Sequence, residues 1–150
     1  MNDLPLPRIV LVATSLSLVP LLAGLVLVAM PGIVPLDPLV GERAIIGYAA
    51  LLLAFLGGVR WGIRASSGAG TDQTYLLGAL GAVLGLITLV LPFQLAIALL
   101  TVGFAAHGAW DVWSGYRGAI PEPYARRRMS ATLMACAVLI AIFAVHAAKV

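Results

Sequence analysis

The chain has 150 residues and a formal net charge of +3, and 62% of its residues are hydrophobic while only 10% are charged. Soluble domains average ~45–50% apolar and ~25% charged residues, and a soluble protein of this size has too much surface to hide the excess. The composition therefore excludes an isolated soluble enzyme and indicates an integral membrane protein, whose basic residues orient it in the bilayer instead of binding nucleic acid.

The first apolar stretch runs from about residue 9 to residue 30, long enough to cross a ~30 Å hydrocarbon core at ~1.5 Å per residue. A cleavable signal peptide is the alternative, but signal cores are shorter, usually ~7–15 residues. We expect a retained span with a kink at Pro20. The segment from Pro31 to Pro38 contains three prolines, which predict a loop at the membrane surface.

Four further spans are predicted downstream. The second covers about residues 44 to 63, and Glu42 precedes it, where a carboxylate favours the positive end of the helix dipole. The apolar run from residue 75 to residue 113 would make a helix of ~58 Å, nearly twice the core thickness. Pro92 therefore divides it into antiparallel spans over residues 74–91 and 93–113, and the fifth span covers residues 129–148. We expect an all-α fold, a single domain over residues 1–150 that forms a bundle of five transmembrane helices.

Five spans put the two termini on opposite sides of the membrane. The side of the N-terminus would carry seven basic residues, and the other side would carry only Arg43 and Lys149. Because basic residues stay on the cytoplasmic side, we expect a bacterial-type inner membrane with the N-terminus cytoplasmic and the C-terminus outside. The seven basic residues are Arg8, Arg60, Arg64, Arg117, Arg126, Arg127 and Arg128.

Glycines spaced four residues apart share one helix face and let two backbones approach closely. This spacing predicts tight packing between helices of the chain, and a homodimer face is the alternative. The glycines assigned to helix packing are Gly57, Gly58, Gly62, Gly78, Gly81 and Gly85.

Polar and aromatic residues collect where the second and fourth spans end, on the predicted cytoplasmic side. Because a charge in the hydrocarbon is costly and usually paired, we predict that Asp111 pairs with Arg60 or Arg64, and that the reversal Arg60→Asp/Asp111→Arg restores expression lost in each single variant. The cluster either joins two helices or forms a polar pocket for a headgroup, a proton or a quinone-like ligand, with His107 titratable near neutral pH. Its members are Arg60, Trp61, Arg64, His107, Trp110 and Asp111.

No cofactor, metal or catalytic residue is predicted. His107 and His146 would lie more than ~10 Å apart along the membrane normal, too far for one haem iron to bridge. The chain has no Cys/His cluster, Gly-rich phosphate loop or H-E-x-x-H sequence. The single cysteine, Cys136, is expected to be a buried structural thiol. We therefore expect no enzymatic activity.

The segment before the fifth span combines an aromatic anchor with basic residues. Tyrosine favours the headgroup level, and each basic residue near anionic lipid contributes ~1 kcal/mol. Tyr124, Arg126, Arg127 and Arg128 are therefore predicted at the lipid interface, where they orient the protein. A docking site for an acidic partner is the alternative.

The second span also carries a distinctive run of residues. Tyr48 followed by Phe55-Leu56-Gly57-Gly58-Val59-Arg60-Trp61-Gly62 resembles the signature of the domain-of-unknown-function family numbered 3429, whose animal members are called transmembrane protein 69. Trp110, Tyr124, the run of three arginines and Thr132 also resemble that family, and the resemblance covers roughly residues 4 to 143. It implies about five helices and an inner-membrane location, and it implies no activity.

The leading interpretation is a non-enzymatic inner-membrane protein, an accessory, assembly or interaction subunit of a membrane complex. Its expected partners are the lipid bilayer and either a larger membrane protein complex or further copies of itself. The alternative is a small transporter or proton-linked carrier that uses Arg60, His107 and Asp111 as its polar path. A third class is a membrane enzyme acting on lipid or quinone. The apolar runs in the first, third and fifth spans offer few polar groups through the membrane depth, which counts against a carrier.

Overall fold

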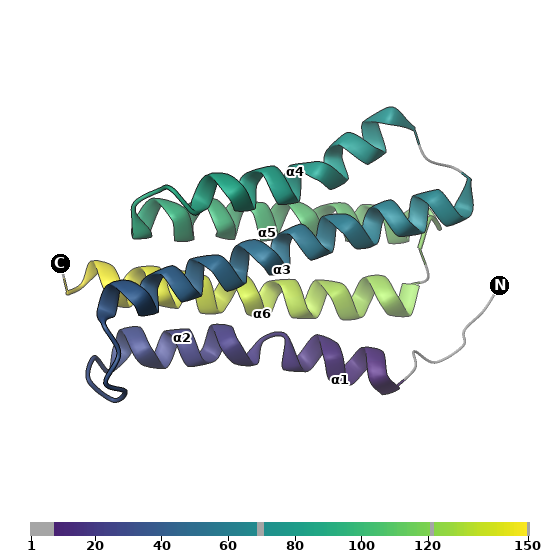
Figure 1. Ribbon diagram of the computed structural model, residues 1–150. Helices are drawn as coiled ribbons and strands as arrows, with labels where there is room; N and C mark the ends of the chain where they lie inside the picture. Colours follow the sequence, from purple (N-terminus) through teal and green to yellow (C-terminus); the bar gives the residue numbers. More distant parts are fainter. Residues whose placement is uncertain (1–7, 69–70, 121, 150) are drawn as a thin grey trace.

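The computed structural model describes residues 8–68, 71–120 and 122–149. The described residues form helices and no strands, and the helices run alongside one another in alternating directions (Figure 1). They are α1 (Arg8–Leu16), α2 (Val19–Ala29), α3 (Pro38–Ser67), α4 (Asp72–Thr88), α5 (Phe93–Tyr116) and α6 (Glu122–Ala147). Since α1 and α2 follow one another along one line, the predicted all-helical bundle of five rods is confirmed.

Four of these rods have the length and apolar character of membrane spans. They are the α1–α2 rod together with α3, α5 and α6, and α4 is a shorter apolar helix. At ~1.5 Å per residue, the 30 residues of α3 extend over ~45 Å and the 17 residues of α4 over ~25 Å.

Two helices, α3 and α6, begin a turn or more before the residue that the sequence predicted. α3 begins at Pro38 instead of residue 44, because the side chain of Asp37 accepts a hydrogen bond from the Leu39 amide at 2.8 Å and a proline in the first turn gives up an amide that has no intrahelical acceptor. α6 begins at Glu122 instead of residue 129, with a proline again in its first turn. Pro38, which was interpreted as part of a loop, instead lies at a helix start.

The predicted kink in the first rod is a break. α1 ends at Leu16 and α2 begins at Val19, so Pro20 lies in the first turn of α2. Just before it the regular pattern of helical hydrogen bonds is interrupted, since the Leu18 amide donates to the Ser15 carbonyl three residues earlier. A proline ring clashes with the carbonyl four residues earlier, which explains why the break precedes Pro20. The Tyr48 hydroxyl of α3 donates to the Ser17 carbonyl at 2.6 Å, so α3 satisfies a backbone acceptor at the break.

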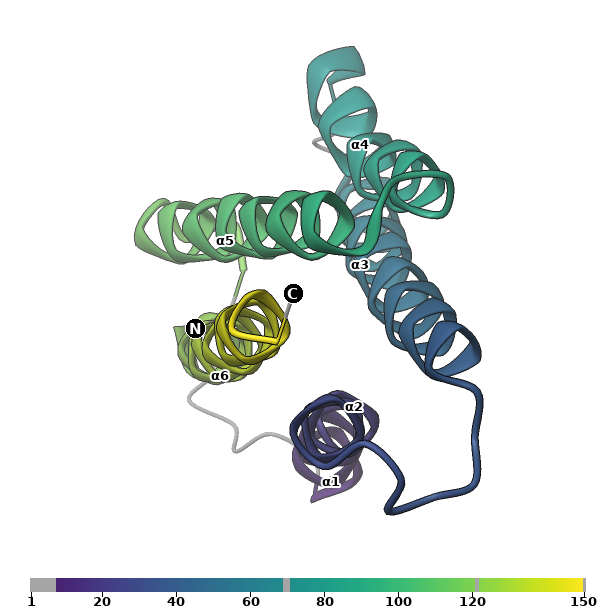
Figure 2. The same cartoon turned by 90° about the vertical axis from the view of Figure 1, so that its left-hand side faces the viewer.

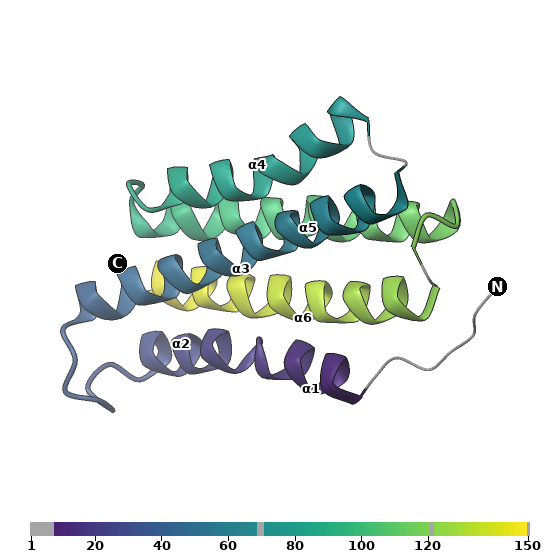
Figure 3. The same ribbon diagram turned by 45° about the vertical axis from the view of Figure 1, so that its right-hand side comes forward.

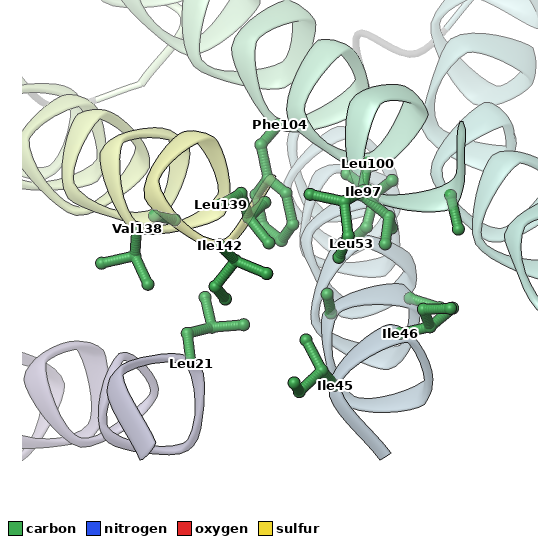
Figure 4. Close-up of a cluster of buried hydrophobic side chains, with 14 of the residues drawn as sticks. Leu21, Ile45, Ile46, Leu53, Ile97, Leu100, Phe104, Val138, Leu139 and Ile142 are labelled. Atoms are coloured by element: carbon green, nitrogen blue, oxygen red, sulfur yellow. The ribbon is translucent and has the colours of Figure 1, made fainter. Parts of the chain in front are cut away.

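The end-on view shows how the rods are arranged around the core (Figure 2). α6 packs between α5 and the α1–α2 rod, α3 contacts α2, α4 and α5, and α4 lies outermost against α3 and α5. The turned side view shows the same neighbours (Figure 3). The core is a cluster of apolar side chains from α2, α3, α5 and α6 that includes Leu21, Leu53, Phe104, Leu139 and Ile142, each at most 1% exposed (Figure 4).

Four of the predicted packing glycines lie where α3 and α4 touch. A Cβ on Gly57 would come within 2.1 Å of the Gly78 carbonyl oxygen, and one on Gly81 or Gly85 would come within 2.8 or 2.9 Å of a carbonyl of α3. Glycine therefore permits a backbone approach that any side chain would block.

Gly58 and Gly62 do not pack against another helix in the described part of the chain, so for these two glycines only the alternative of a homodimer face stays a prediction. Both are exposed, and a Cβ at either would meet nothing within 4 Å. Successive residues of a helix point ~100° apart, so Gly57 faces α4 while its neighbour Gly58 faces outward. Four-residue spacing identified a shared face but could not identify which face is covered.

Candidate functional site

A buried carboxylate between two arginines is the main polar feature of the bundle. Asp111 Oδ1 accepts from Arg60 Nη2 at 2.6 Å, and Asp111 Oδ2 accepts from Arg128 Nε at 2.8 Å. Nη2 of Arg128 lies 2.7 Å from the same oxygen Oδ2. The side chain of Asp111 is 5% exposed, and those of Arg60 and Arg128 are 12% and 10% exposed. We call these three residues the Arg–Asp–Arg cluster.

The Arg–Asp–Arg cluster joins three helices. Arg60 lies on α3, Asp111 on α5 and Arg128 on α6. Arg60 Nη2 also donates to the His107 carbonyl at 2.8 Å, and its guanidinium lies 5.4 Å from the ring centre of Trp110. These contacts use the charge, the hydrogen-bonding edge and the flat face of the guanidinium. The ammonium group of lysine has the charge but neither the planar edge nor the flat face.

The predicted pairing of Asp111 with one of two arginines is resolved in favour of Arg60. Arg64, one turn further along α3, lines a cavity of about 20 Å³ beside Asp111, together with Ser114. Ser114 is 3% exposed. Both predicted candidates therefore lie on the face of α3 that is turned toward Asp111, and Arg60 forms an ion pair with it.

Arg128 was assigned to the lipid interface as a surface residue, but its side chain points into the bundle. Only 8% of the residue is exposed, and its guanidinium lies against Asp111 and 5.8 Å from the ring centre of Tyr124. The sequence did hold a signal. Thr132, Ala135 and Leu139 follow Arg128 at spacings of four, three and four, and all are buried, so Arg128 continues the inward stripe of α6.

Of the other residues predicted at the lipid interface, one lies on the surface and two contact side chains or backbone within the bundle. Arg126 is exposed and pairs with Glu122 one turn away. Arg127 donates to Ser15 Oγ at 2.6 Å and to the Leu11 carbonyl at 3.4 Å, which ties α6 to α1. Tyr124 is half-buried beneath Arg128. Of the four, Arg126 alone has the fully surface position that the sequence suggested.

Trp61 belongs to a different contact from the one predicted. Its indole Nε1 donates to the Tyr75 carbonyl at 2.6 Å, and its ring meets the Tyr75 ring edge-on with centroids 5.5 Å apart. The same ring covers Gly78, where a Cβ would come within 2.4 Å of it. Trp61 therefore joins α3 to α4 and takes no part in the Arg–Asp–Arg cluster.

His107 lies beside the Arg–Asp–Arg cluster without bonding to the Asp111 carboxylate. Its Nδ1 donates to the Gly103 carbonyl at 3.0 Å, since a carbonyl can only accept. Its Nε2 is buried and has no hydrogen-bond partner among the described residues. This nitrogen faces the backbone of α4, because a Cβ on Gly81 would lie 3.1 Å from it.

A second polar pair, which the sequence did not predict, lies at the opposite end of the bundle. His146 Nε2 lies 3.1 Å from Glu42 Oε1, and its ring lies 4.6 Å from the ring centre of Phe93. Since Phe93 and His107 are separated by about four turns of α5, the two histidines lie ~20 Å apart along that helix. Among the described residues no three His, Cys, Asp or Glu side chains gather as a metal site would require.

Comparison with known proteins identifies the family of the chain. No curated protein and no solved structure matches it. The model of one protein family, described as "Protein of unknown function (DUF3429)", matches residues 6–144, close to the range over which the sequence resembled that family. The chain therefore belongs to the DUF3429 family.

Proposed function

We propose that this protein is a non-enzymatic subunit of an inner-membrane complex, which it enters as a five-span integral membrane protein with its N-terminus in the cytoplasm. Long apolar helices support the membrane location, because large hydrophobic side chains such as Leu51, Leu86 and Val90 are 69–81% exposed on their outer faces. Such faces are stable in lipid and would aggregate in water.

The orientation is supported by the positions of the basic residues on the helices. Arg8 begins α1, Arg64 lies in the last turn of α3, and Arg117 follows α5. Together with the arginines that open α6, they lie at the end of the bundle where α1 begins (Figure 1). Arg43 and Lys149 lie at the other end. Basic residues favour the cytoplasmic side, so the end of the bundle where α1 begins faces the cytoplasm.

The observation that carries the accessory role is that the interior polar groups bind one another across helices. The Arg–Asp–Arg cluster joins α3, α5 and α6, and the Glu42–His146 pair joins α3 to α6 at the far end. Between these two polar layers lies the filled core around Leu53, Phe104 and Leu139. A carrier needs polar groups along its whole path, so this arrangement favours a fixed helical scaffold over the carrier alternative.

The accessory role is tested by purifying the tagged protein from native membranes in mild detergent and identifying the proteins that co-elute. We expect one membrane partner in a fixed ratio to the chain, absent when a different multi-pass protein with the same tag is purified in parallel. Recovery of the chain alone, as a single species, would contradict the accessory role. Proton uptake by liposomes that requires Asp111 would favour the carrier instead.

A further inference from the structure

A lateral groove opens between α1 and α3 on the side of the bundle that faces lipid in the proposed membrane location. Within the described residues, α1 contacts α2 and α6 but not α3, and a groove of about 340 Å³ lies between them. Its floor is formed by α6 and by Phe104 of α5. This volume lies within the ~300–1,000 Å³ range of small-molecule sites.

The groove has one apolar part and one polar end. Leu52, Leu56 and Ala135 line the part nearer the membrane centre, and the Tyr48–Ser17 hydrogen bond closes the space between α3 and the first rod near that end. Tyr124 and Arg128 line the opposite end. The groove therefore has the polarity of an amphipathic ligand with a polar head and an apolar tail.

The polar end carries unbalanced positive charge. Arginine stays protonated in proteins, so the Arg–Asp–Arg cluster has two positive charges against one negative charge in a buried position. Nη2 of Arg128 is buried and makes no aligned hydrogen bond among the described residues, although it lies 2.7 Å from Asp111. Uncompensated charge next to hydrocarbon is costly, and an anionic group beside Arg128 would offset it.

The depth of Arg128 matches that of a lipid phosphate. Arg128 lies six residues after the start of α6, which is ~9 Å along the helix. The polar headgroup layer of each leaflet is ~5–7 Å thick. With the start of α6 placed at the outer edge of that layer, as the proposed location implies, Arg128 lies close to the boundary between headgroups and acyl chains. From that boundary the apolar part of the groove runs toward the membrane centre, as an acyl chain does.

We propose that this groove binds one membrane phospholipid with a net negative headgroup, its phosphate beside Arg128 and one acyl chain between α1 and α3. The assignment rests on the membrane location of the proposed function but not on the accessory role. Arg127 contributes indirectly, because its bonds to Ser15 and Leu11 hold α1 against α6 and so keep one wall of the groove in place.

The test fills the groove without changing any charge. Ala131 lines the groove floor, whereas Leu133 lies on the same helix and is 62% exposed away from it. Ala131→Phe and Leu133→Phe are therefore matched variants. Each purified protein is mixed with phosphatidylglycerol or with phosphatidylcholine of the same chain length, and bound lipid is counted by native mass spectrometry.

We expect wild type and Leu133→Phe to retain one phosphatidylglycerol and to bind phosphatidylcholine at least about tenfold more weakly. Ala131→Phe should lose the bound phosphatidylglycerol while keeping its elution volume and helical content. Equal retention by Ala131→Phe would overturn the proposal, because it would assign the lipid to surface arginines such as Arg126. Protection of the wild type from heat by inorganic phosphate as strongly as by the lipid would overturn it too, since the acyl chain would then contribute nothing.

The outcome is separable from that of the proposed function. A reporter that locates the C-terminus outside the cytoplasm tests membrane insertion with no lipid added, and co-purification tests the accessory role. If the protein inserts into the membrane and co-purifies with a partner but does not select phosphatidylglycerol, only the proposal of a lipid-binding groove is rejected.

Discussion

Asp111 is the only buried carboxylate among the described residues, and both of its oxygens accept from arginines of other helices. The three side chains therefore depend on one another. Removing the carboxylate leaves two guanidinium groups facing each other with no anion between them, whereas removing one arginine leaves a simple ion pair. The carboxylate is the residue on which the cluster depends most.

We predict that Asp111→Asn destabilises the protein by about 3–5 kcal/mol, the usual cost of leaving a buried charge without its partner. The measurement is the thermal unfolding midpoint in detergent, with the expressed amount as a second readout. Glu122→Gln is the control, because Glu122 is 75% exposed and its pair with Arg126 lies on the surface, where such pairs contribute at most ~1 kcal/mol. Similar midpoints for the two variants would contradict the structural role of the cluster.

Arg128 changes the outcome expected of the charge reversal. In Arg60→Asp/Asp111→Arg the new arginine would face Arg128, so only one of the two ion pairs would reform. We predict that this double variant recovers little of the lost expression. The triple variant Arg60→Asp/Asp111→Arg/Arg128→Asp mirrors the native charges and should recover more. Full recovery in the double variant would mean that Arg128 contributes nothing to the cluster.

At the scale of the elements, the contact between α3 and α4 depends on small residues. Gly57, Gly81 and Gly85 each lie so close to the facing helix that an added Cβ would come within 2.9 Å of one of its carbonyl oxygens. Trp61 covers Gly78, and its indole donates to the Tyr75 carbonyl. Close backbone approach lets many weak dispersion contacts form in the absence of a hydrophobic driving force between helices in lipid.

We predict that Gly57→Ala separates α3 from α4 and costs about 1–3 kcal/mol, as overpacking usually does. The neighbouring change Gly58→Ala is the matched control, since nothing lies within 4 Å of its Cβ position and alanine favours a helix by up to ~1 kcal/mol over glycine. Thermal unfolding of both variants in detergent provides the comparison. A lower midpoint for Gly58→Ala than for Gly57→Ala would show that the outward glycine face is the packed one, as in a homodimer.

At the scale of the whole molecule, charge is distributed unevenly between the two ends. The end at which α1 begins carries Arg60 and Arg64 of α3 together with the arginines of α6 and of the α5–α6 turn. The end at which α6 finishes carries Arg43, near the start of α3, and Lys149. Lys149 donates to the Val28 and Ala29 carbonyls at 2.6 and 2.9 Å, so it also caps the end of α2. This difference between the ends is the basis of the proposed orientation.

We predict that alkaline phosphatase fused to the C-terminus is active and that a fluorescent protein fused there is dark, because the first works only outside the cytoplasm and the second only inside it. The same reporters inserted between Gly118 and Ile120, in the turn after α5, should give the opposite results. A fluorescent C-terminal fusion would reverse the orientation or reduce the number of spans.

The existence of five apolar rods could be predicted from the sequence alone, because hydrophobicity along the chain is a local property that neighbouring helices do not change. The break near Pro20 and the turn at Pro92 were predictable for the same reason, since proline acts on its own backbone. The start of α3 at Pro38 was missed because the effect of a proline depends on whether it falls in the first turn or in the interior of a helix.

Only the tertiary structure decided which side chains meet. The rotation of each helix about its axis determines that Gly57 faces α4 while Gly58 faces outward, and that Arg128 faces Asp111 while Arg126 faces away. That rotation is set by packing with helices distant in sequence. The sequence could therefore suggest that Asp111 needs a cation and narrow one partner to Arg60 or Arg64, since burying an unpaired charge is costly wherever it occurs. The second partner, Arg128, was identified only once α3, α5 and α6 were brought together.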